Sequence, residues 1–222
     1  MELFKTKTIR DIEVAYWAFQ TFGMGVELPT QYKRAVEKLL AQHETRIEQL
    51  KAIAALCRDD KTPKALWIKA YAYVWAGASC RREAIIALTE YLQGEIYFDG
   101  PNDMIGLGST KVRRYDALRA EACIYLGKAY DGEYEFENAL ACFRRAFIFD
   151  ATSYGVYLMI ADTYRKMNNL ELAIHTLEVA KEKTSPRDDM QFSFNEALVD
   201  LRAKKARGYI YRPRKPREKK TM

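Results

Sequence analysis

A glycine-rich run, four cysteines and two histidines are the residues in this chain that could carry chemistry. The run from Gly106 to Lys111 has the composition of a phosphate-binding loop, but it lacks the Gly-x-x-x-x-Gly-Lys-Ser/Thr spacing and follows no predicted strand. A flexible connection is the favoured interpretation. Neither His43 nor His175 stands near a cysteine or serine in a nucleophile context, so no catalytic triad can be built. We therefore expect no enzymatic activity and no cofactor.

The cysteines favour packing over metal binding. They are Cys57, Cys80, Cys123 and Cys142, and their separations of 23, 43 and 19 residues leave no Cys-x-x-Cys pair for a zinc site. Cys123 and Cys142 lie on apolar helix faces and are expected to be small core residues. Cys80 precedes two arginines at a predicted helix start, which would stabilise a thiolate, but no base or second cysteine accompanies it. We expect no metal site and a structural role for Cys80.

Positive charge is concentrated at the C-terminal end of the chain. From Arg202 onward ten Lys or Arg residues stand against Glu218 alone, a net charge of +9, whereas the remainder has 26 basic and 29 acidic residues, a net charge of −3. The side chains that could contact phosphates and bases are Tyr209, Tyr211, Arg212, Arg214, Lys215 and Arg217. The tail, residues 208–222, could equally bind an acidic groove or anionic lipid, act as a nuclear address, or remain a solubilising end. The sequence favours a docking element, kept extended by Pro213 and Pro216.

The predicted helices that precede the tail repeat one residue pattern 34 positions apart. The first copy is Leu126-Gly127-Lys128-Ala129-Tyr130 followed by Ala139, Phe143 and Ala146, and the second is Ile160-Ala161-Asp162-Thr163-Tyr164 followed by Ala173, Leu177 and Ala180. Ala139, Phe143 and Ala146 share one helical face, on which the small residues admit a close neighbour and the phenylalanine fills the gap. That face is predicted to be a seam between paired helices.

This pattern resembles the tetratricopeptide repeat, a family of paired helices. A weaker copy lies upstream in Ile68, Tyr71, Ala72, Trp75, Ala84, Leu88 and Tyr91. Thr62 is the expected cap of its first helix, with Pro63 at the first helical position, and Ser79 is the expected cap of its second. The resemblance implies an all-α fold, a right-handed superhelical stack of antiparallel helix pairs with an N-terminal capping helix pair and a C-terminal capping helix. Essentially no sheet is expected, because no segment alternates as a strand does.

The N-terminal third is also predicted to be helical but does not follow the repeat. A helix from Ile9 to Phe22 ends at Gly23 and Gly25, and Thr30 is a plausible cap for the next one. That helix has a heptad seam, with alternating steps of four and three, at Val36, Leu40, His43, Ile47, Leu50, Ala54 and Cys57. The seam either covers the exposed face of the first repeat or pairs with a second copy of the chain in a homodimer. We favour the first alternative, a cap, because the end of a helical-repeat array must be covered.

The expected organisation is an N-terminal helical cap (1–61), a degenerate repeat pair (62–98), an inserted loop (99–111), two repeat units (112–186), a C-terminal capping helix (187–207) and the basic tail (208–222). Gly94 and a cluster of glycines from 100 to 108 forbid a continuous helix through the insertion. No run approaches the roughly eighteen apolar residues of a membrane span, and the N-terminus has no apolar signal core. We expect a cytoplasmic protein, without excluding the nucleus.

In proteins that this chain resembles, the first helix of each pair lines a concave face that reads a partner. The resemblance places on that face Lys69, Tyr73, Tyr125, Lys128, Asp162, Arg165 and Lys166. Some members of the family grip a C-terminal carboxylate with a Lys/Asn arrangement, but Asp162 stands where the asparagine would be. The expected function is therefore that of a protein-interaction module or adaptor that binds a peptide or partner helix. The alternative is a nucleic-acid-associated factor that uses the basic tail on nucleic acid or another polyanion.

Overall fold

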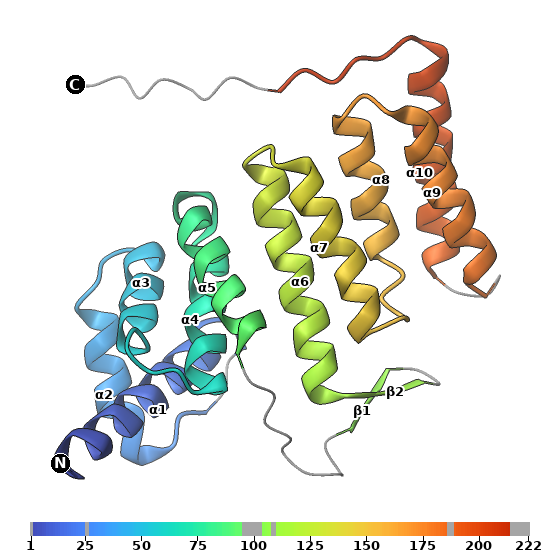
Figure 1. Cartoon of the computed structure of the whole chain (residues 1–222). Helices are drawn as coiled ribbons and strands as arrows, with labels where there is room; N and C mark the ends of the chain where they lie inside the picture. The colour runs from blue at the N-terminus through green and yellow to red at the C-terminus, as the bar shows by residue number, and fades with distance from the viewer. Residues whose placement is uncertain (1, 25–26, 95–103, 108–109, 186–188, 214–222) are drawn as a thin grey trace, which may run out of the picture. The chain divides into compact units, whose positions relative to one another are not determined.

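The computed structural model describes the chain except residues 1, 25–26, 95–103, 108–109, 186–188 and 214–222 (Figure 1). The chain divides into two compact units, an N-terminal unit of Met1–Asp150 and a C-terminal unit of Ala151–Met222, and each is described by itself. Within each unit the repeat segments form antiparallel helix pairs joined by short turns, as Figure 1 shows. The expected all-α class is confirmed, apart from one short hairpin.

The N-terminal unit consists of α1 (Glu2–Met24), α2 (Thr30–Ala41), α3 (Arg46–Leu56), α4 (Pro63–Trp75), a 3₁₀ turn (Gly77–Cys80), α5 (Arg81–Gln93), β1 (Met104–Leu107), β2 (Thr110–Arg113), α6 (Arg114–Gly132) and α7 (Phe136–Phe149). The C-terminal unit consists of α8 (Val156–Lys166), α9 (Leu170–Lys183) and α10 (Met190–Ala206). The pairs α4–α5, α6–α7 and α8–α9 correspond to the three copies of the repeat.

The first three helices cover the outer side of α4, as the capping interpretation expects. Buried apolar side chains of α1, α2, α3 and α4 form one core cluster, in which Val36, Leu50 and Ile53 are fully buried. The expectation of one continuous helix from residue 36 to residue 57 is wrong, because α2 ends at Ala41 and α3 begins at Arg46. Thr45 starts α3 through a capping box with Glu48, in which each side chain bonds the other residue's backbone N–H.

The seam predicted for the repeat is buried in both copies. Its residues Ala139, Phe143, Ala146, Ala173, Leu177 and Ala180 are at most 2% exposed. Gly127 is required for close approach in the α6–α7 pair, because a Cβ at this position would lie 2.5 Å from the ring of Phe143. The second copy has Ala161 and Leu177 at the equivalent positions, so a smaller side chain opposite admits a larger one here.

A left-handed residue ends the first helix of both pairs, again 34 residues apart. Tyr134 has φ of 65° and Asn168 has φ of 61°. In each turn the next backbone N–H reaches back over the helix end, from Glu135 to the carbonyl of Tyr130 at 2.9 Å and from Asn169 to the carbonyl of Tyr164 at 2.9 Å. These are Schellman-type ends that satisfy otherwise unpaired carbonyls. The repeat is therefore also a repeat of turn geometry.

The inserted segment holds a structure that the sequence reasoning missed. β1 and β2 pair antiparallel with Leu107 opposite Thr110, so the segment predicted to be an irregular loop contains a hairpin immediately before α6. Four-residue strands are too short for their alternation to stand out in a sequence. The run from Gly106 to Lys111, which has the composition of a phosphate-binding loop, includes residues of both strands, and residues 108–109 lie outside the described residues.

Of the expected helix starts, that of α4 was right and the caps of α5 and α2 were wrong. Thr62 caps α4 by accepting from the N–H of Ala65, and Pro63 takes the first helical position. Ser79 caps nothing, because the 3₁₀ turn places Cys80 at the start of α5, and α2 begins at Thr30 without a side-chain cap. Trp75, a member of the weaker copy of the repeat, is 54% exposed at the end of α4.

The C-terminal unit is closed by α10 in the predicted way. Phe194, Leu198 and Leu201 are buried against the seam residues of α9, and Met190 packs at the edge of the same cluster. Gly208, with φ of 65°, ends α10 and turns the chain into the tail. The N–H of Tyr209 bonds the carbonyl of Lys204 at 3.0 Å, a third Schellman-type end. The tail therefore leaves the helix in a defined direction.

Candidate partner-binding surfaces

The two residues of α4 that were expected to face a partner make contacts within their own unit. Lys69 is 8% exposed and is ion-paired to Glu90 of α5, whose carboxylate also pairs with Lys61. The hydrogen bonds from Lys61 and Lys69 hold the pKa of Glu90 below its usual range. Removing a buried lysine from its paired carboxylate is costly, so we leave Lys69 out of the proposed binding surface.

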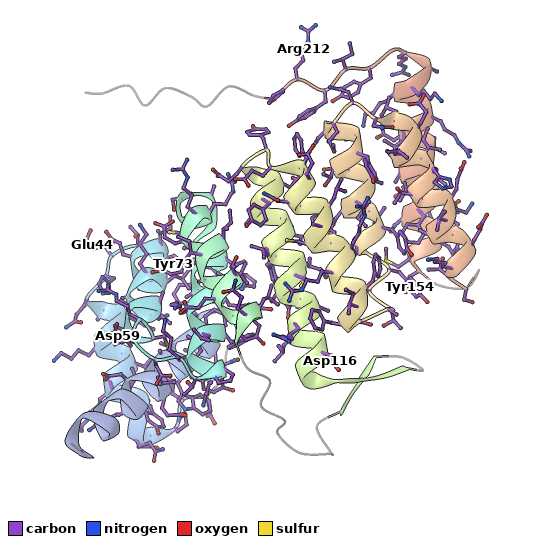
Figure 2. All side chains as sticks on the ribbon, in the orientation of Figure 1. Glu44, Asp59, Tyr73, Asp116, Tyr154 and Arg212 are labelled. Carbon is purple, nitrogen blue, oxygen red and sulfur yellow. The ribbon has the colours of Figure 1, made fainter. Side chains whose placement is uncertain are left out.

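Tyr73, also on α4, packs against the N-terminal core cluster at the position labelled in Figure 2. It is half-buried, and burial raises the pKa of its hydroxyl, with a further contribution from the negative charge of Glu83. Both residues therefore contact side chains of their own unit: Lys69 pairs with α5, and Tyr73 packs against the core cluster of α1 to α4.

On α6 the predicted residues Tyr125 and Lys128 form a stacked pair. The Lys128 ammonium lies 5.3 Å from the centre of the Tyr125 ring, and Lys128 is exposed while Tyr125 is half-buried. A cation over an aromatic face is stabilised by the quadrupole of the ring. Glu121, one turn earlier on the same helix, lies beside them. Burial raises the pKa of Glu121, while the hydroxyls of Tyr71 and Tyr125 and the charge of Lys128 act in the opposite direction.

An aromatic row connects this pair to the rest of the N-terminal unit. Phe19, Trp67, Tyr71 and Tyr125 follow one another with ring centroids 5.4, 5.0 and 5.4 Å apart, and they come from α1, α4 and α6. The Trp67 indole nitrogen is buried without a hydrogen-bond partner in the described part of the chain, and the Tyr71 hydroxyl lies near Glu121 without a hydrogen bond of normal geometry. The row fixes the orientation of Tyr125.

Sequence reasoning missed the aromatic row, although part of the signal was present. Trp67 and Tyr71 are four residues apart, so they share a helix face. That Glu121 and Tyr125 meet this face, however, follows only from the packing of α4 and α6 near one another, which no local pattern specifies.

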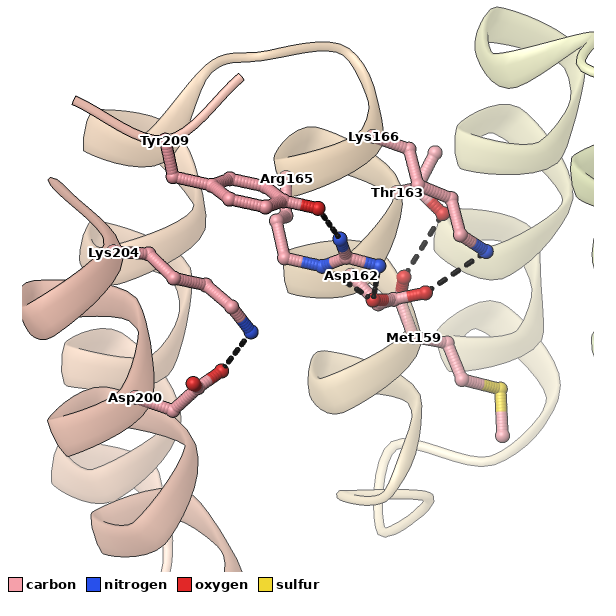
Figure 3. A network of polar contacts seen from close by, with 8 residues as sticks. All are labelled: Met159, Asp162, Thr163, Arg165, Lys166, Asp200, Lys204 and Tyr209. Carbon is pink, nitrogen blue, oxygen red and sulfur yellow. Dashed lines mark hydrogen bonds and ion pairs between the residues drawn. The ribbon is translucent and has the colours of Figure 1, made fainter. Parts of the chain in front are cut away.

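On α8 the three predicted residues form a polar network (Figure 3). Asp162 accepts from the Nε of Arg165 at 2.9 Å and from its Nη2 at 2.7 Å, and its other oxygen pairs with the Lys166 ammonium at 2.9 Å. Burial acts to raise the pKa of Asp162, but the bonds from Lys166 and Arg165 outweigh it and the pKa is lowered. The guanidinium of Arg165 is thereby held in one orientation.

The first tail residues lie on this network. The Tyr209 hydroxyl accepts from Arg165 Nη1 at 3.2 Å, and the Arg165 guanidinium lies 5.3 Å from the centre of the Tyr211 ring. The Lys204 ammonium lies 5.7 Å from the centre of the Tyr209 ring. The two rings that the sequence offered for stacking on bases therefore lie against cations of their own unit.

The remaining predicted tail residues are less constrained. Arg212 is exposed and points away from the helices in Figure 2, whereas Arg214, Lys215 and Arg217 lie outside the described residues. Their role in binding a polyanion stays a prediction.

The other chemistry considered from the sequence finds no site in the described part of the chain. No group of three or more His, Cys, Asp or Glu side chains could hold a metal ion among those residues. Cys57, Cys80 and Cys123 are fully buried, and Cys142 is partly buried. Burial raises the pKa of the Cys57 thiol to about 12 and that of Cys123 to about 11. No described helix has the length and apolar character to cross a membrane.

Comparison with known proteins supports the fold. Neither a family model nor a curated protein matches the sequence. Among solved structures, a putative kinesin light chain of Podosopora anserina with nearly identical TPR-like repeats aligns with 89% of this chain and 85% of its own, at 14% identity and a TM-score of 0.51. MamA aligns with 82% of this chain and 99% of its own, at 15% identity and a TM-score of 0.47. The alignment with the kinesin light chain structure supports the all-α, TPR-like solenoid fold that the 34-residue pattern predicted.

Proposed function

We propose that this chain is a protein-interaction module without catalytic activity, and that the face of α6 formed by Glu121, Tyr125 and Lys128 binds a peptide or helix of a partner protein. The observation that carries the proposal is the stacked Tyr125–Lys128 pair, held from behind by the aromatic row. An aromatic ring held in place can bury a partner's apolar side chain with little loss of conformational entropy.

The charges around the ring define the chemistry of the partner. Lys128 offers an exposed cation to one end of Tyr125 along the helix, and the partly buried carboxyl of Glu121 lies toward the other end. Residues at positions 121, 125 and 128 are spaced by four and three, so they form one stripe along the helix. A partner that suits this stripe carries an apolar or aromatic anchor between a basic and an acidic side chain. Helix-in-groove and extended-peptide recognition both meet that requirement.

A peptide library displayed on phage tests the proposal directly. Selection on the full chain should enrich peptides with an apolar anchor flanked by opposite charges, and their Kd should be measured by fluorescence anisotropy. Tyr125→Ala should weaken binding by roughly 2 kcal/mol or more, as for a buried anchor. Lys128→Ala should cost less, because its charge is exposed. Tyr125→Phe should retain most of the affinity, since the ring remains.

Matched substitutions elsewhere in the N-terminal unit provide the controls. Trp75→Ala removes an exposed aromatic ring outside the row, and Lys33→Ala removes an exposed cation of α2. Both should leave the Kd unchanged. If the selected peptides bind the Tyr125→Ala variant as well as the parent while its helicity by circular dichroism is intact, the α6 face is not the binding site.

Binding measurements on the same purified chain at several salt concentrations test the nucleic-acid alternative. Counterion release makes affinity for nucleic acid fall steeply with salt, whereas an aromatic anchor is weakly affected. Binding to an oligonucleotide that falls steeply with salt and survives Tyr125→Ala would favour the basic tail as the functional element. A cytoplasmic location remains part of the proposal, and imaging of the tagged chain in its host tests it.

A further inference from the structure

We propose that Arg165 and Asn168 form a second peptide-binding site, specific for an extended segment with the pattern Tyr-x-Tyr, and that residues 209–211 of the chain occupy it in cis. A partner segment with the same pattern would replace them and release the basic tail. This site belongs to the C-terminal unit and does not depend on the α6 face proposed above.

The recognition of the peptide backbone is the central observation. The Asn168 side chain accepts from the Tyr211 N–H at 2.5 Å and donates from its amide nitrogen to the Tyr211 carbonyl at 3.5 Å. One amide group thus contacts both polar groups of a single residue in an extended segment. This contact fixes the position of the peptide backbone but does not select a side chain, so the preference for tyrosine must come from another residue.

Arg165 supplies the side-chain preference. It donates to the Tyr209 hydroxyl and lies over the Tyr211 ring, so one guanidinium contacts two tyrosines separated by one residue. The residue between them, Ile210, is 63% exposed and adds no buried apolar contact. The pattern that the site reads is therefore aromatic, any residue, aromatic, with a hydroxyl on the first ring.

The site is formed by residues of α8 and its turn without help from the tail. Asp162 holds the guanidinium of Arg165, and the Schellman-type end of α8 fixes Asn168 in its left-handed conformation. The equivalent turn of the other repeat has Tyr134, whose side chain carries no amide group. Asparagine is common in left-handed turns for conformational reasons alone. A glycine substitution separates the two roles because it retains the turn and removes the amide.

The bound segment is suited to exchange. Gly208 connects it to α10, and the space around Gly208 is open. Its contacts are polar and cation–π contacts at a half-exposed surface, where each interaction contributes little net stability. Tyr209 and Tyr211 are only half-buried, so release of the segment exposes no core.

The test uses the full chain and a labelled peptide with the sequence of residues 207–213. In the chain variant Tyr209→Ser/Tyr211→Ser the cis segment is disengaged, and this variant should bind the peptide. The parent chain, whose own segment competes, should bind it about tenfold more weakly. A peptide with both tyrosines replaced by serine has the same charge and should not bind. Fluorescence anisotropy at low and high salt provides the readout.

Asn168→Gly on the disengaged chain should weaken peptide binding about tenfold, the loss expected for two hydrogen bonds. The matched control is Tyr134→Gly, which makes the same backbone change at the equivalent turn and should leave binding unchanged. Three results would overturn the proposal: no binding to the disengaged chain, equal binding to the parent, or no effect of Asn168→Gly. Sedimentation velocity adds a fourth: a dimer of the parent that is lost in the serine variant would show that the segment reaches a second copy.

Discussion

The helix pairs α6–α7 and α8–α9 have the same packing pattern but differ on the face of their first helix that points away from the seam, which we call the outer face. Their seams agree position by position, since Ala139 and Ala146 of one correspond to Ala173 and Ala180 of the other. The left-handed residue that ends the first helix also recurs at the same place. The outer faces differ: α6 presents Tyr125 and Lys128, and α8 presents an ion-paired network whose Arg165 contacts Tyr209 and Tyr211.

This difference shows which residue positions are constrained by helix packing and which can vary between repeats. A seam position must admit a neighbouring helix at close range, so only small or gap-filling residues are tolerated there. A residue on the outer face has no such constraint and can differ between repeats. The seams are therefore where substitutions should change stability most, and the outer faces are where they should change binding.

The largest effect is expected from overpacking the seams. Ala139→Leu and Ala173→Leu should each lower the free energy of unfolding by ~1–3 kcal/mol, because no space exists for three more carbon atoms. Chemical denaturation of each variant provides the measurement. The control is Ala141→Leu, an exposed position two residues from Ala139, which should change stability little. Equal effects at Ala139 and Ala141 would show that the seam register is wrong.

A second prediction exchanges the gap-filling pair between the two repeats. Gly127→Ala should destabilise by about 1–2 kcal/mol, because the new methyl group meets the Phe143 ring and the helix-propensity gain of roughly 1 kcal/mol offsets only part of the strain. Gly127→Ala/Phe143→Leu copies the Ala161/Leu177 pair of the other repeat. The double variant should therefore be more stable than the sum of the two single effects predicts. Simple additivity in this double-mutant cycle would contradict the contact.

The shared seams of the two helix pairs could be predicted from the sequence, but several side-chain contacts could not. The seam residues followed from the 34-residue period, because buried positions carry a strong residue-type signal. The ion pair of Lys69 was not predicted because its partner, Glu90, belongs to another helix. Such contacts are set by tertiary packing, which local periodicity does not specify.

The candidate binding surfaces also depend on tertiary contacts that the sequence pattern does not specify. Tyr125 and Lys128 could be named from the repeat, but the stacking of Tyr125 on Tyr71 could not. The tail was predicted to dock, and its charge drew attention to nucleic acid. The structure instead places its tyrosines on Arg165, a contact between positions 44 residues apart that no spacing rule suggests. The split of the expected continuous helix at residues 42–45 was missed because a regular heptad pattern continued through the break.

A third prediction concerns the shared left-handed turn, where the two copies should respond with opposite sign. Tyr134→Gly relieves a conformation that costs a residue other than Gly about 1–2 kcal/mol, and the greater unfolded-state freedom of glycine cancels part of the gain. Asn168→Gly gains less, because asparagine tolerates this conformation, and it loses the bonds to Tyr211. We expect a small rise in Tm for the first variant and a small fall for the second. Equal shifts would show that the amide of Asn168 contributes nothing.

The smallest effects are expected from the carboxylates of the two outer faces, whose pKa values shift in opposite directions. Burial raises the pKa of Glu121, so the folded state holds a proton that the unfolded state loses between the usual value of 4.5 and the raised one. Stability should fall as the pH rises through that window and remain lower above it. The pKa of Asp162 is lowered by Lys166 and Arg165, so its stabilisation is present above its usual value of 3.8 and is lost as the pH falls through the lowered one.

Amide substitutions should reveal both signs in denaturation curves measured across pH. Glu121→Gln should stabilise the chain slightly at neutral pH and have no effect at pH values well below 4.5, because the carboxyl is then neutral in both states. Asp162→Asn should destabilise at neutral pH by less than about 1 kcal/mol, since solvent screens this partly exposed pair. Its effect should vanish in acid. If both substitutions shifted stability in the same direction at neutral pH, the two faces would not differ in how they treat a charge, and the argument that α6 shields its carboxylate among aromatic rings would fail.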